Sequence, residues 1–319
     1  MVDILHICCS TDDNYVQHCA VMLCSLFENN NKLHFEVHIL ISKLSSENID
    51  RLNNLVSKYD NICSFHRVDS SLLKGAQYRI KRPLTEAAYY RVLLSSILDS
   101  SINKVLYLDC DLLVLEDISE IFKLEIDDYP LAAVQEPVEI TDKHRNQLSI
   151  PYGESYFNSG VLLINLEYWR NNDSQVKLIE FSKRKRFVYC HDQDALNYVF
   201  KKKWYRLPPK WNKSNIATLD NIDFYNLIDK REYVKNPIIV HFIDEPKPWQ
   251  GIYGMRNRKG YYKYLKLAQW KDIAPKCNFS KSLIMYKRLV VYYTKTLLYK
   301  LGLLRIIKEL KIVTLGKFG

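Results

Sequence analysis

Two aspartates, Asp109 and Asp111, directly follow the apolar segment 104–108, which reads KVLYL. Side chains two positions apart at a strand end point to the same side, so these carboxylates can share one ligand while Cys110 faces away. Two close carboxylates repel each other unless a cation or a proton lies between them. A divalent metal ion that bridges a phosphorylated substrate is the natural occupant, and a solvated acidic turn is the alternative.

A histidine in a second apolar segment is another candidate for chemistry. His241 lies near the end of residues 237–242, which read PIIVHF, and Lys247 follows in a loop between two prolines. The imidazole can ligate a metal ion, and the lysine can neutralise phosphate as a point charge. A hydrogen-bonded core histidine and a surface lysine are the alternative.

Three further polar segments have a structural explanation beside a chemical one. Asp192 and Gln193 lie where a helix is expected to begin, so Asp192 can simply stabilise the helix N-terminus. Asn158 opens a buried strand and can belong to a plain turn. Residues 10–15 read STDDNY, and their Asp and Asn side chains can cap the helix that follows.

Strands and helices must position these residues. We expect strands over 3–9, 34–41, 62–68 and 104–108, and helices over 15–28, 45–59 and 85–98. Such alternation of apolar, β-branched runs with helical patterns predicts βαβ units and a mostly parallel α/β sheet. Ligands of such sheets bind at the carboxyl ends of the strands, so the loops after residues 9 and 108 are the first places to search.

The second half of the chain is mixed. We expect strands over 131–134, 160–165 and 237–242, and helices near 173–187 and 192–202. After about residue 275, short apolar runs alternate with Lys and Arg. We therefore predict one large domain over residues 1–275 and a basic, apolar segment over 276–319.

The composition is that of a globular protein, with 47% apolar and 26% charged residues in a chain of 319. The N-terminus lacks a basic region, so no secretory signal is predicted, and no apolar run is long enough to span a bilayer. None of the cysteines forms a C-x-x-C pair. We expect reduced core thiols and a cytoplasmic protein, because disulfides belong to oxidising compartments. The cysteines are Cys8, Cys9, Cys19, Cys24, Cys63, Cys110, Cys190 and Cys277.

The positive charge is concentrated in the tail. The formal net charge is +10, and residues 281–319 carry nine Lys or Arg and a single acid, Glu309. The remaining chain is therefore nearly neutral. The tail is too often charged to cross a bilayer, but its Leu and Tyr can enter the headgroup region while its cations meet anionic lipid. The basic residues do not collect on one clean helical face, which leaves a regular amphipathic helix open; a tail helix packed on the domain is the alternative.

Six blocks, in this order, resemble glycosyltransferase family 8, and in particular its bacterial lipopolysaccharide α-glucosyl- and α-galactosyltransferases. The blocks are DDNY from residue 12, YYR from 89, KVLYLDCDLLV from 104, FNSGVLLINLEYW from 157, HDQDALN from 191 and HF-x4-KPW from 241. The resemblance covers about residues 3–250. It implies a GT-A fold, a Rossmann-like sheet that binds a sugar nucleotide at its carboxyl edge.

The resemblance also implies roles for residues. Asp109, Asp111 and His241 would hold Mn²⁺, for which mixed nitrogen and oxygen ligands are suited. Asn158 and Asp192 would bind hydroxyls of the donor sugar, and Gln193 would lie beside its anomeric carbon. The remaining donor contacts, to uridine, ribose, diphosphate or sugar, would be made by Thr11, Asp12, Asp13, Asn14, Tyr15, Arg91, Cys110 and Lys247, together with the two metal-binding aspartates.

The implied reaction retains anomeric configuration. It would move a hexose, glucose or galactose, from UDP to an oligosaccharide or lipid-linked glycan at the cytoplasmic face of the inner membrane. A double displacement needs a nucleophile opposite the leaving group, and the amide of Gln193 is a poor one. We therefore expect front-face attack by the acceptor hydroxyl, with the metal ion and Lys247 stabilising the departing UDP.

Two positions depart from the family pattern. Asp244 replaces a glycine that usually lies close to the diphosphate, and Gln135-Glu136 replace an aspartate that helps to bind acceptor in some members. Both changes leave the substrate open. The alternatives to an active transferase are an inactive sugar-nucleotide-binding domain and a basic nucleic-acid-binding protein. The body of the chain lacks the basic surface and the motifs of the latter, so we expect no nucleic acid partner.

Overall fold

The structure is a computed structural model, which describes residues 4–75, 86–136, 140–183, 191–214, 237–243, 246–253, 255–270 and 277–301. Its centre is a seven-stranded sheet with strand order β3-β2-β1-β4-β7-β6-β8. Only β7 runs antiparallel to both of its neighbours, so the predicted mostly parallel α/β sheet is confirmed. The strands are β1 (Ile4–Ser10), β2 (His34–Ile41), β3 (Ile62–Arg67), β4 (Lys104–Leu108), β6 (Leu131–Gln135), β7 (Phe157–Asn165) and β8 (Tyr205–Leu207).

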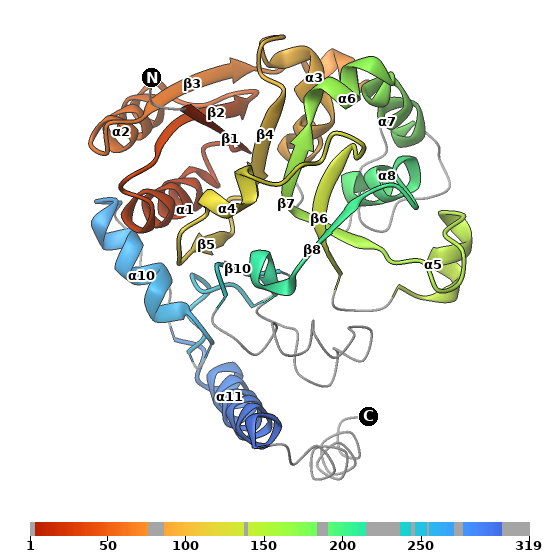
Figure 1. Cartoon of the computed structure of the whole chain (residues 1–319). Coiled ribbons are helices and arrows are strands. Elements are labelled where there is room, and N and C mark those ends of the chain that lie inside the picture. Colours follow the sequence, from red (N-terminus) through yellow and green to blue (C-terminus); the bar gives the residue numbers. More distant parts are fainter. Residues whose placement is uncertain are drawn as a thin grey trace.

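Helices cover both faces of this sheet (Figure 1). One apolar core lies between the sheet and α1 (Val16–Asn29), α2 (Ser46–Ser57) and α10 (Arg258–Leu267). The other lies under a second group of helices. That group comprises the 3-10 helix η2 (Glu86–Leu93) and the helices α3 (Leu94–Ile97), α6 (Leu166–Asn171), α7 (Ser174–Ser182) and α8 (His191–Val199). All nine residues of β7 are buried, as expected of a strand covered on both faces.

A small sheet, β5-β10-β9, lies beside the end of β4. It is built from β5 (Leu112–Val114), β9 (Lys213–Ser214) and β10 (Ile239–His241). Short helical elements complete the fold: η1 (Ser70–Leu73), α4 (Ser119–Phe122), α5 (Asp142–Gln147) and η3 (Pro209–Trp211). Because β5 follows Asp111 immediately, this small sheet decides what faces the two aspartates.

Several expected elements differ in detail from the observed ones. The helix expected over 85–98 was wrong in kind, because a 3-10 helix over Glu86–Leu93 precedes a single α-helical turn. The expected helix near 173–187 is α7, which ends at Ser182 within the part described. The helix expected over 45–59 is α2, which is capped by Ser45, whose side chain accepts a hydrogen bond from the backbone N–H of Asn48.

The tail begins with α11 (Phe279–Lys300), a 22-residue helix that projects from the body of the molecule (Figure 1). The described residues of α11 form an amphipathic helix, a point that the sequence had left open. Apolar side chains recur at spacings of three and four residues and so share one face, and each is at least half exposed or nearly so. This apolar stripe consists of Phe279, Leu283, Tyr286, Val290, Tyr293, Leu297 and Leu301.

The basic residues Lys281 and Arg288 each follow a stripe residue by two positions, which places them on the opposite side of α11. The start of the helix contacts the body, where Ser282 is buried and its hydroxyl accepts a hydrogen bond from the backbone N–H of Tyr253. No helix among the residues described is long and apolar enough to cross a membrane.

Candidate active site

Two aspartates and a histidine meet at the carboxyl edge of β4. Asp109 and Asp111 follow β4, and the antiparallel pairing of β10 with β5 places His241 opposite Leu112. The Nε2 atom of His241 lies 3.2 Å from an oxygen of Asp111 and 3.8 Å from an oxygen of Asp109. One potential ligand atom from each residue lies within 4.8 Å of the others. The structure therefore brings together the three residues expected to bind metal.

A chain of hydrogen bonds fixes the orientation of His241. The carboxylate of Glu136 accepts from the amide nitrogen of Asn158, whose oxygen accepts from Asn212 at 2.8 Å. The oxygen of Asn212 therefore faces Nδ1 of His241, 3.1 Å away, and accepts its proton. This leaves the Nε2 lone pair directed at the aspartates, the arrangement that a metal-binding histidine requires.

Asn212 was not singled out by the sequence reasoning. Its only signal was its place after a Trp in a Pro-containing loop, which does not show that it lies between Asn158 and His241. The buried position of Asn212, together with its partners on β7 and β10, makes it part of the site.

Gly160 on β7 leaves the space that the histidine occupies. A Cβ atom at this position would lie 2.1 Å from Cε1 of His241 and 2.9 Å from an oxygen of Asp109. Both distances are far below van der Waals contact. The glycine in the segment FNSGV is therefore required by the site and not by backbone conformation.

Two cations compensate the carboxylates. Buried Arg91 pairs with Asp109 at 2.7 Å and with Asp192 at 3.0 Å. Lys247 pairs with Asp111 at 2.6 Å and also donates to the backbone oxygen of Phe242. Burial raises the pKa of Asp111, but Lys247 and His241 outweigh it and hold that pKa well below its usual range. Arg91 thus lies behind the aspartates, whereas Lys247 approaches from the side of β10.

Asp192 and Gln193, at the start of α8, are tied to the rest of the site. Asp192 is buried and ion-paired with Arg91, so stabilising the N-terminus of α8 is not its only role. Burial, only partly offset by Arg91, raises the pKa of Asp192 to about 6. The side-chain oxygen of Gln193 accepts hydrogen bonds from the backbone and the hydroxyl of Ser159. The catalytic candidates Asn158, Asp192 and Gln193 therefore surround the same segment of β7.

The loop after β1 lies at the same edge. The Asp12 carboxylate accepts from the N–H groups of Asn14 and Tyr15, which shapes the turn into α1. The Asp13 carboxylate accepts from Ser45 and Asn48, and these bonds lower its pKa. Thr11 is buried, and its N–H donates to Leu40. Asp12 thus shapes the turn before α1, whereas Asp13 does not cap α1 but ties the loop to the start of α2.

Tyr15 connects this loop with the loop that carries Lys247. Its ring meets Trp249 edge-on at 6.0 Å between centroids, and Trp249 stacks on His18 at 3.7 Å. Burial followed by the nearby charge of Asp111 raises the pKa of Tyr15. Neither His18 nor the stacking of Trp249 was anticipated from the sequence.

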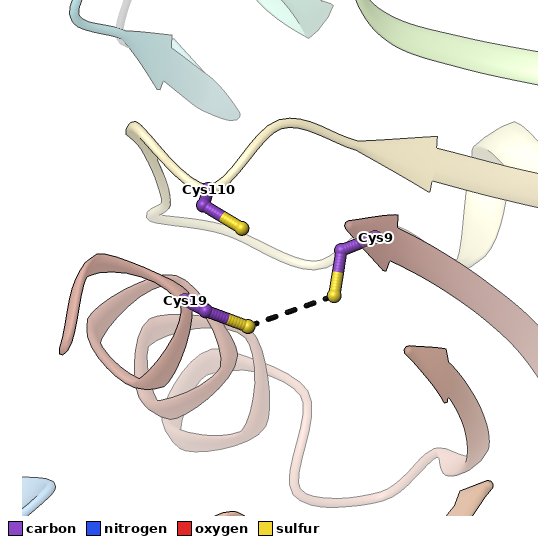
Figure 2. A group of neighbouring side chains, drawn as sticks. All are labelled: Cys9, Cys19 and Cys110. Atoms are coloured by element: carbon purple, nitrogen blue, oxygen red, sulfur yellow. Dashed lines mark hydrogen bonds between the residues drawn. The ribbon is translucent and has the colours of Figure 1, made fainter. Parts of the chain in front are cut away.

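Cys110 faces away from the aspartates, as expected, and joins Cys9 and Cys19 beneath the loop (Figure 2). The sulfurs of Cys9 and Cys19 are 3.6 Å apart. Within the described part of the chain all cysteines are free, which confirms the reduced state there. The expectation of core positions was wrong for Cys277, which is exposed, and Cys190 lies outside the described residues. Because Cys110 is buried and points toward other thiols, its side chain is poorly placed for a donor contact.

The two departures from the family pattern have different outcomes. Asp244 lies outside the described residues. Gln135 ends β6 and accepts a hydrogen bond from Ser155, whereas Glu136 accepts from Asn158 at 2.9 Å and from Gln193 at 3.5 Å. Glu136 is therefore part of the hydrogen-bond network around His241.

This chain is similar to several known proteins. It is 32% identical to General stress protein A of Bacillus subtilis, over 85% of this chain and 96% of that protein. It is 28% identical to a lipopolysaccharide 1,2-glucosyltransferase of Escherichia coli, over 82% of this chain and 78% of that protein.

Among solved structures, the galactosyltransferase LgtC in complex with donor and acceptor sugar analogues matches with a TM-score of 0.75. The match has 24% sequence identity and covers 82% of this chain and 96% of that one. The fold is thus GT-A, as expected. The family model for glycosyl transferase family 8 matches residues 6–253. This match spans most of the chain, which therefore belongs to glycosyltransferase family 8 and is a glycosyl-transferring enzyme.

Proposed function

We propose that the enzyme is a metal-dependent, retaining hexosyltransferase that moves glucose or galactose from UDP to a saccharide acceptor. The observation that carries the proposal is the convergence of Asp109, Asp111 and His241 with Lys247 at the carboxyl edge of β4. The acceptor is a lipopolysaccharide core or another cell-surface glycan, in keeping with the similar glucosyltransferase of E. coli and galactosyltransferase LgtC.

Mn²⁺ would be held by Asp109, Asp111 and Nε2 of His241. The site fits such an ion, because two carboxylates and one nitrogen converge and because Nδ1 of His241 is already engaged by Asn212. When bound, the ion would neutralise negative charge on the diphosphate. The ion pair with Arg91 orients Asp109 from behind, so its carboxylate needs no reorganisation to bind the ion.

The donor would lie across the loop after β1. Tyr15 and Trp249 offer ring surfaces beside the metal-binding loop, and residues Thr11 to Asn14 would contact uridine and ribose. Since Asp12 and Asp13 use their carboxylates within the loop and toward α2, they act mainly by fixing its shape. Lys247, freed from Asp111 by the ion, would move to the diphosphate and stabilise charge on the leaving UDP.

The donor sugar would contact Asn158 and Asp192. Ionised Asp192 would accept a hydrogen bond from a sugar hydroxyl while Arg91 keeps it charged. Gln193 would lie beside the anomeric carbon, its amide held by Ser159. Because an amide is not a nucleophile, the acceptor hydroxyl would attack on the face that UDP leaves, and a phosphate oxygen would take its proton.

The C-terminal segment would hold the enzyme on the cytoplasmic face of the inner membrane. The exposed apolar stripe of α11 can enter the headgroup region while Lys281 and Arg288 on the other side meet anionic lipid. Ser282 at the start of α11 contacts the body, whereas the apolar stripe farther along is exposed, which favours this role over a helix packed on the domain. The membrane-bound location would suit a lipid-linked acceptor.

Donor hydrolysis and transfer test the proposal. A panel of UDP-sugars is incubated with the full chain in Mn²⁺ and then in excess EDTA, and UDP release is measured. We expect release with UDP-glucose or UDP-galactose that EDTA stops and added Mn²⁺ restores. Full activity in EDTA would contradict the proposed metal site. Donor binding without turnover would favour an inactive sugar-nucleotide-binding domain.

Stereochemistry is tested separately by NMR of the first product formed. An α-linked donor should give an α-glycoside. Gln193→Ala should slow transfer without stopping it, because no covalent intermediate forms on the amide. A β-linked initial product contradicts retention.

A further inference from the structure

Three histidines and a glutamate gather on one face of the large sheet, apart from the metal loop. His6 on β1 and Glu36 and His38 on β2 occupy positions whose side chains share a face, because His6 pairs with Glu36 and Cys8 pairs with His38 in the parallel register. The side chains of His6 and Glu36 are about a quarter exposed, whereas His38 is buried between them and β3. The group is therefore reachable from solvent.

One donor atom from each of the three residues points to a common place. Nδ1 of His6 lies 3.1 Å from Nε2 of His38 and 3.6 Å from Oε2 of Glu36, and one potential ligand atom from each of the three residues lies within 4.8 Å of the others. Two nitrogens bonded to one zinc ion at about 2.0–2.1 Å are about 3.0–3.4 Å apart for bond angles near those of a tetrahedron. The observed separation of the nitrogens already fits an ion placed between them.

Residues of β3 orient two of these ligands from behind. Nδ1 of His38 lies 3.0 Å from Nε2 of His66, so a proton on Nδ1 leaves the Nε2 lone pair of His38 free. The hydroxyl of Ser64 donates to Oε1 of Glu36 at 3.0 Å, which leaves Oε2 on the side of His6. Metal-binding histidines and carboxylates are held by such outer partners.

The imidazoles are also in the protonation state that a metal requires. Burial lowers the pKa of His38 to about 4, and burial lowers the pKa values of His6 and His66, against the opposing charge of Glu36. All three rings are therefore neutral at pH 7. In the free protein, Nδ1–H of His6 can donate to His38; on metal binding that proton moves to Nε2 of His6, and no net proton is released.

We propose that His6, Glu36 and His38 form a second metal site, which takes Zn²⁺ through two imidazoles and one carboxylate and leaves a fourth position to water. Two nitrogens and one oxygen favour a borderline ion such as Zn²⁺ over Mg²⁺ or Ca²⁺, which prefer oxygen alone. The site ties β1 to β2 and is independent of the proposed transfer reaction.

The test is Zn²⁺ binding to the full chain, measured by isothermal titration after removal of metal, with His6→Gln, Glu36→Gln and Ser64→Ala. We expect each ligand variant to lose one zinc equivalent or at least 100-fold in affinity, and Ser64→Ala to lose about 10- to 100-fold. His34→Gln is the matched control, because this exposed histidine begins β2 outside the group. Asp111→Asn should keep the site, which separates it from the loop at Asp109–Asp111.

Circular dichroism verifies that the variants fold. If His6→Gln does not fold, the isosteric variant Glu36→Gln still tests the site. Co²⁺ serves as a spectroscopic probe, since nitrogen and oxygen ligands give no near-ultraviolet sulfur-to-cobalt band. Zinc stoichiometry and affinity both unchanged in the two ligand variants, loss of all zinc in Asp111→Asn, or a sulfur band from the thiols of Cys9, Cys19 and Cys110 in place of the expected spectrum would overturn the proposal.

Discussion

Charge and apolar surface are arranged in opposite ways at the metal loop and along α11. At the metal loop, carboxylates and cations are largely buried and matched to one another, as Arg91 is to Asp109 and Lys247 is to Asp111. Along α11, the apolar stripe is exposed, and so are Lys281, Lys287 and Arg288. The first arrangement fixes a few polar atoms for a small ligand, since preorganised charges need no rearrangement. The second suits an extended surface and does not depend on the position of any single atom.

Because its charges are matched atom by atom, the metal loop should lose activity when a single ligand atom is replaced. Asp111→Asn should lower transfer by about 10³-fold, because it removes a metal ligand worth several kcal/mol of charge stabilisation. The same change should leave vesicle binding intact. Initial rates with and without Mn²⁺, and sedimentation with anionic vesicles, measure the two effects. An Asp111→Asn enzyme with near-normal, EDTA-resistant activity would contradict the first expectation.

Gly160→Ala should be nearly as harmful. Its Cβ would collide with His241, which must move or displace β7, so we expect metal affinity to fall by about 100-fold and stability by about 1–3 kcal/mol. Mn²⁺ titration and urea unfolding measure these effects. Gly153→Ala is unsuitable as a steric control because Gly153 has a positive φ, whereas Gly260→Ala meets only a leucine methyl at 3.3 Å and should spare metal binding.

Asn212→Ala tests a residue that does not bind the metal itself but orients the ligand His241. It removes the acceptor of the His241 Nδ1 proton, so Mn²⁺ affinity should fall by about 10- to 100-fold. Asn212→Asp keeps that acceptor and should restore part of the loss. If both variants bind Mn²⁺ like the wild type, the hydrogen-bond chain does not orient the ligand.

The pH dependence tests whether Asp192 acts as a carboxylate. Its pKa is raised to about 6, so the protonated form predominates below pH 6 and the ionised form above it. We expect kcat/KM to rise about tenfold per pH unit below 6 and to level off above it. The effect of pH on stability has the opposite direction. Between the pKa of an aspartate in the unfolded chain, near 4, and about pH 6, rising pH ionises Asp192 in the unfolded chain first and so destabilises the fold. The acidic limb should change in Asp192→Asn; an identical profile would assign it to another group.

The smallest effect on transfer is expected in α11. Val290→Glu places a charge in the apolar stripe and should abolish sedimentation with anionic vesicles while leaving transfer to a soluble acceptor unchanged. Ile284→Glu is the control, because Ile284 is also about half exposed but lies off the stripe. A chain ending at Pro275 should likewise keep donor chemistry. If it is insoluble, or if the full chain ignores such vesicles, the membrane role fails.

Much of the site was predictable because its parts lie at strand ends. The segment KVLYLDCD identified both aspartates and predicted that Cys110 points away from them, and PIIVHF identified His241. The contribution of Asn212 was not predictable, since its hydrogen bonds join segments that are 54 and 29 residues apart. The 3-10 geometry of residues 86–93 was also missed, and the regularity of α11 was left open, because local patterns distinguish such helices poorly.

The sequence alone determined the α/β class, the basic tail and the carboxylate pair, since periodicity, charge and neighbour spacing are local properties. Only the tertiary structure decided that β10 pairs with β5 and so delivers His241 to Asp111. It also decided that the ring of His241 packs against Gly160, where no Cβ atom would fit. His6, Glu36 and His38 likewise meet on one face of the large sheet only in the folded chain. These outcomes depend on strand order and register, which follow from the packing of the whole chain and not from any one segment.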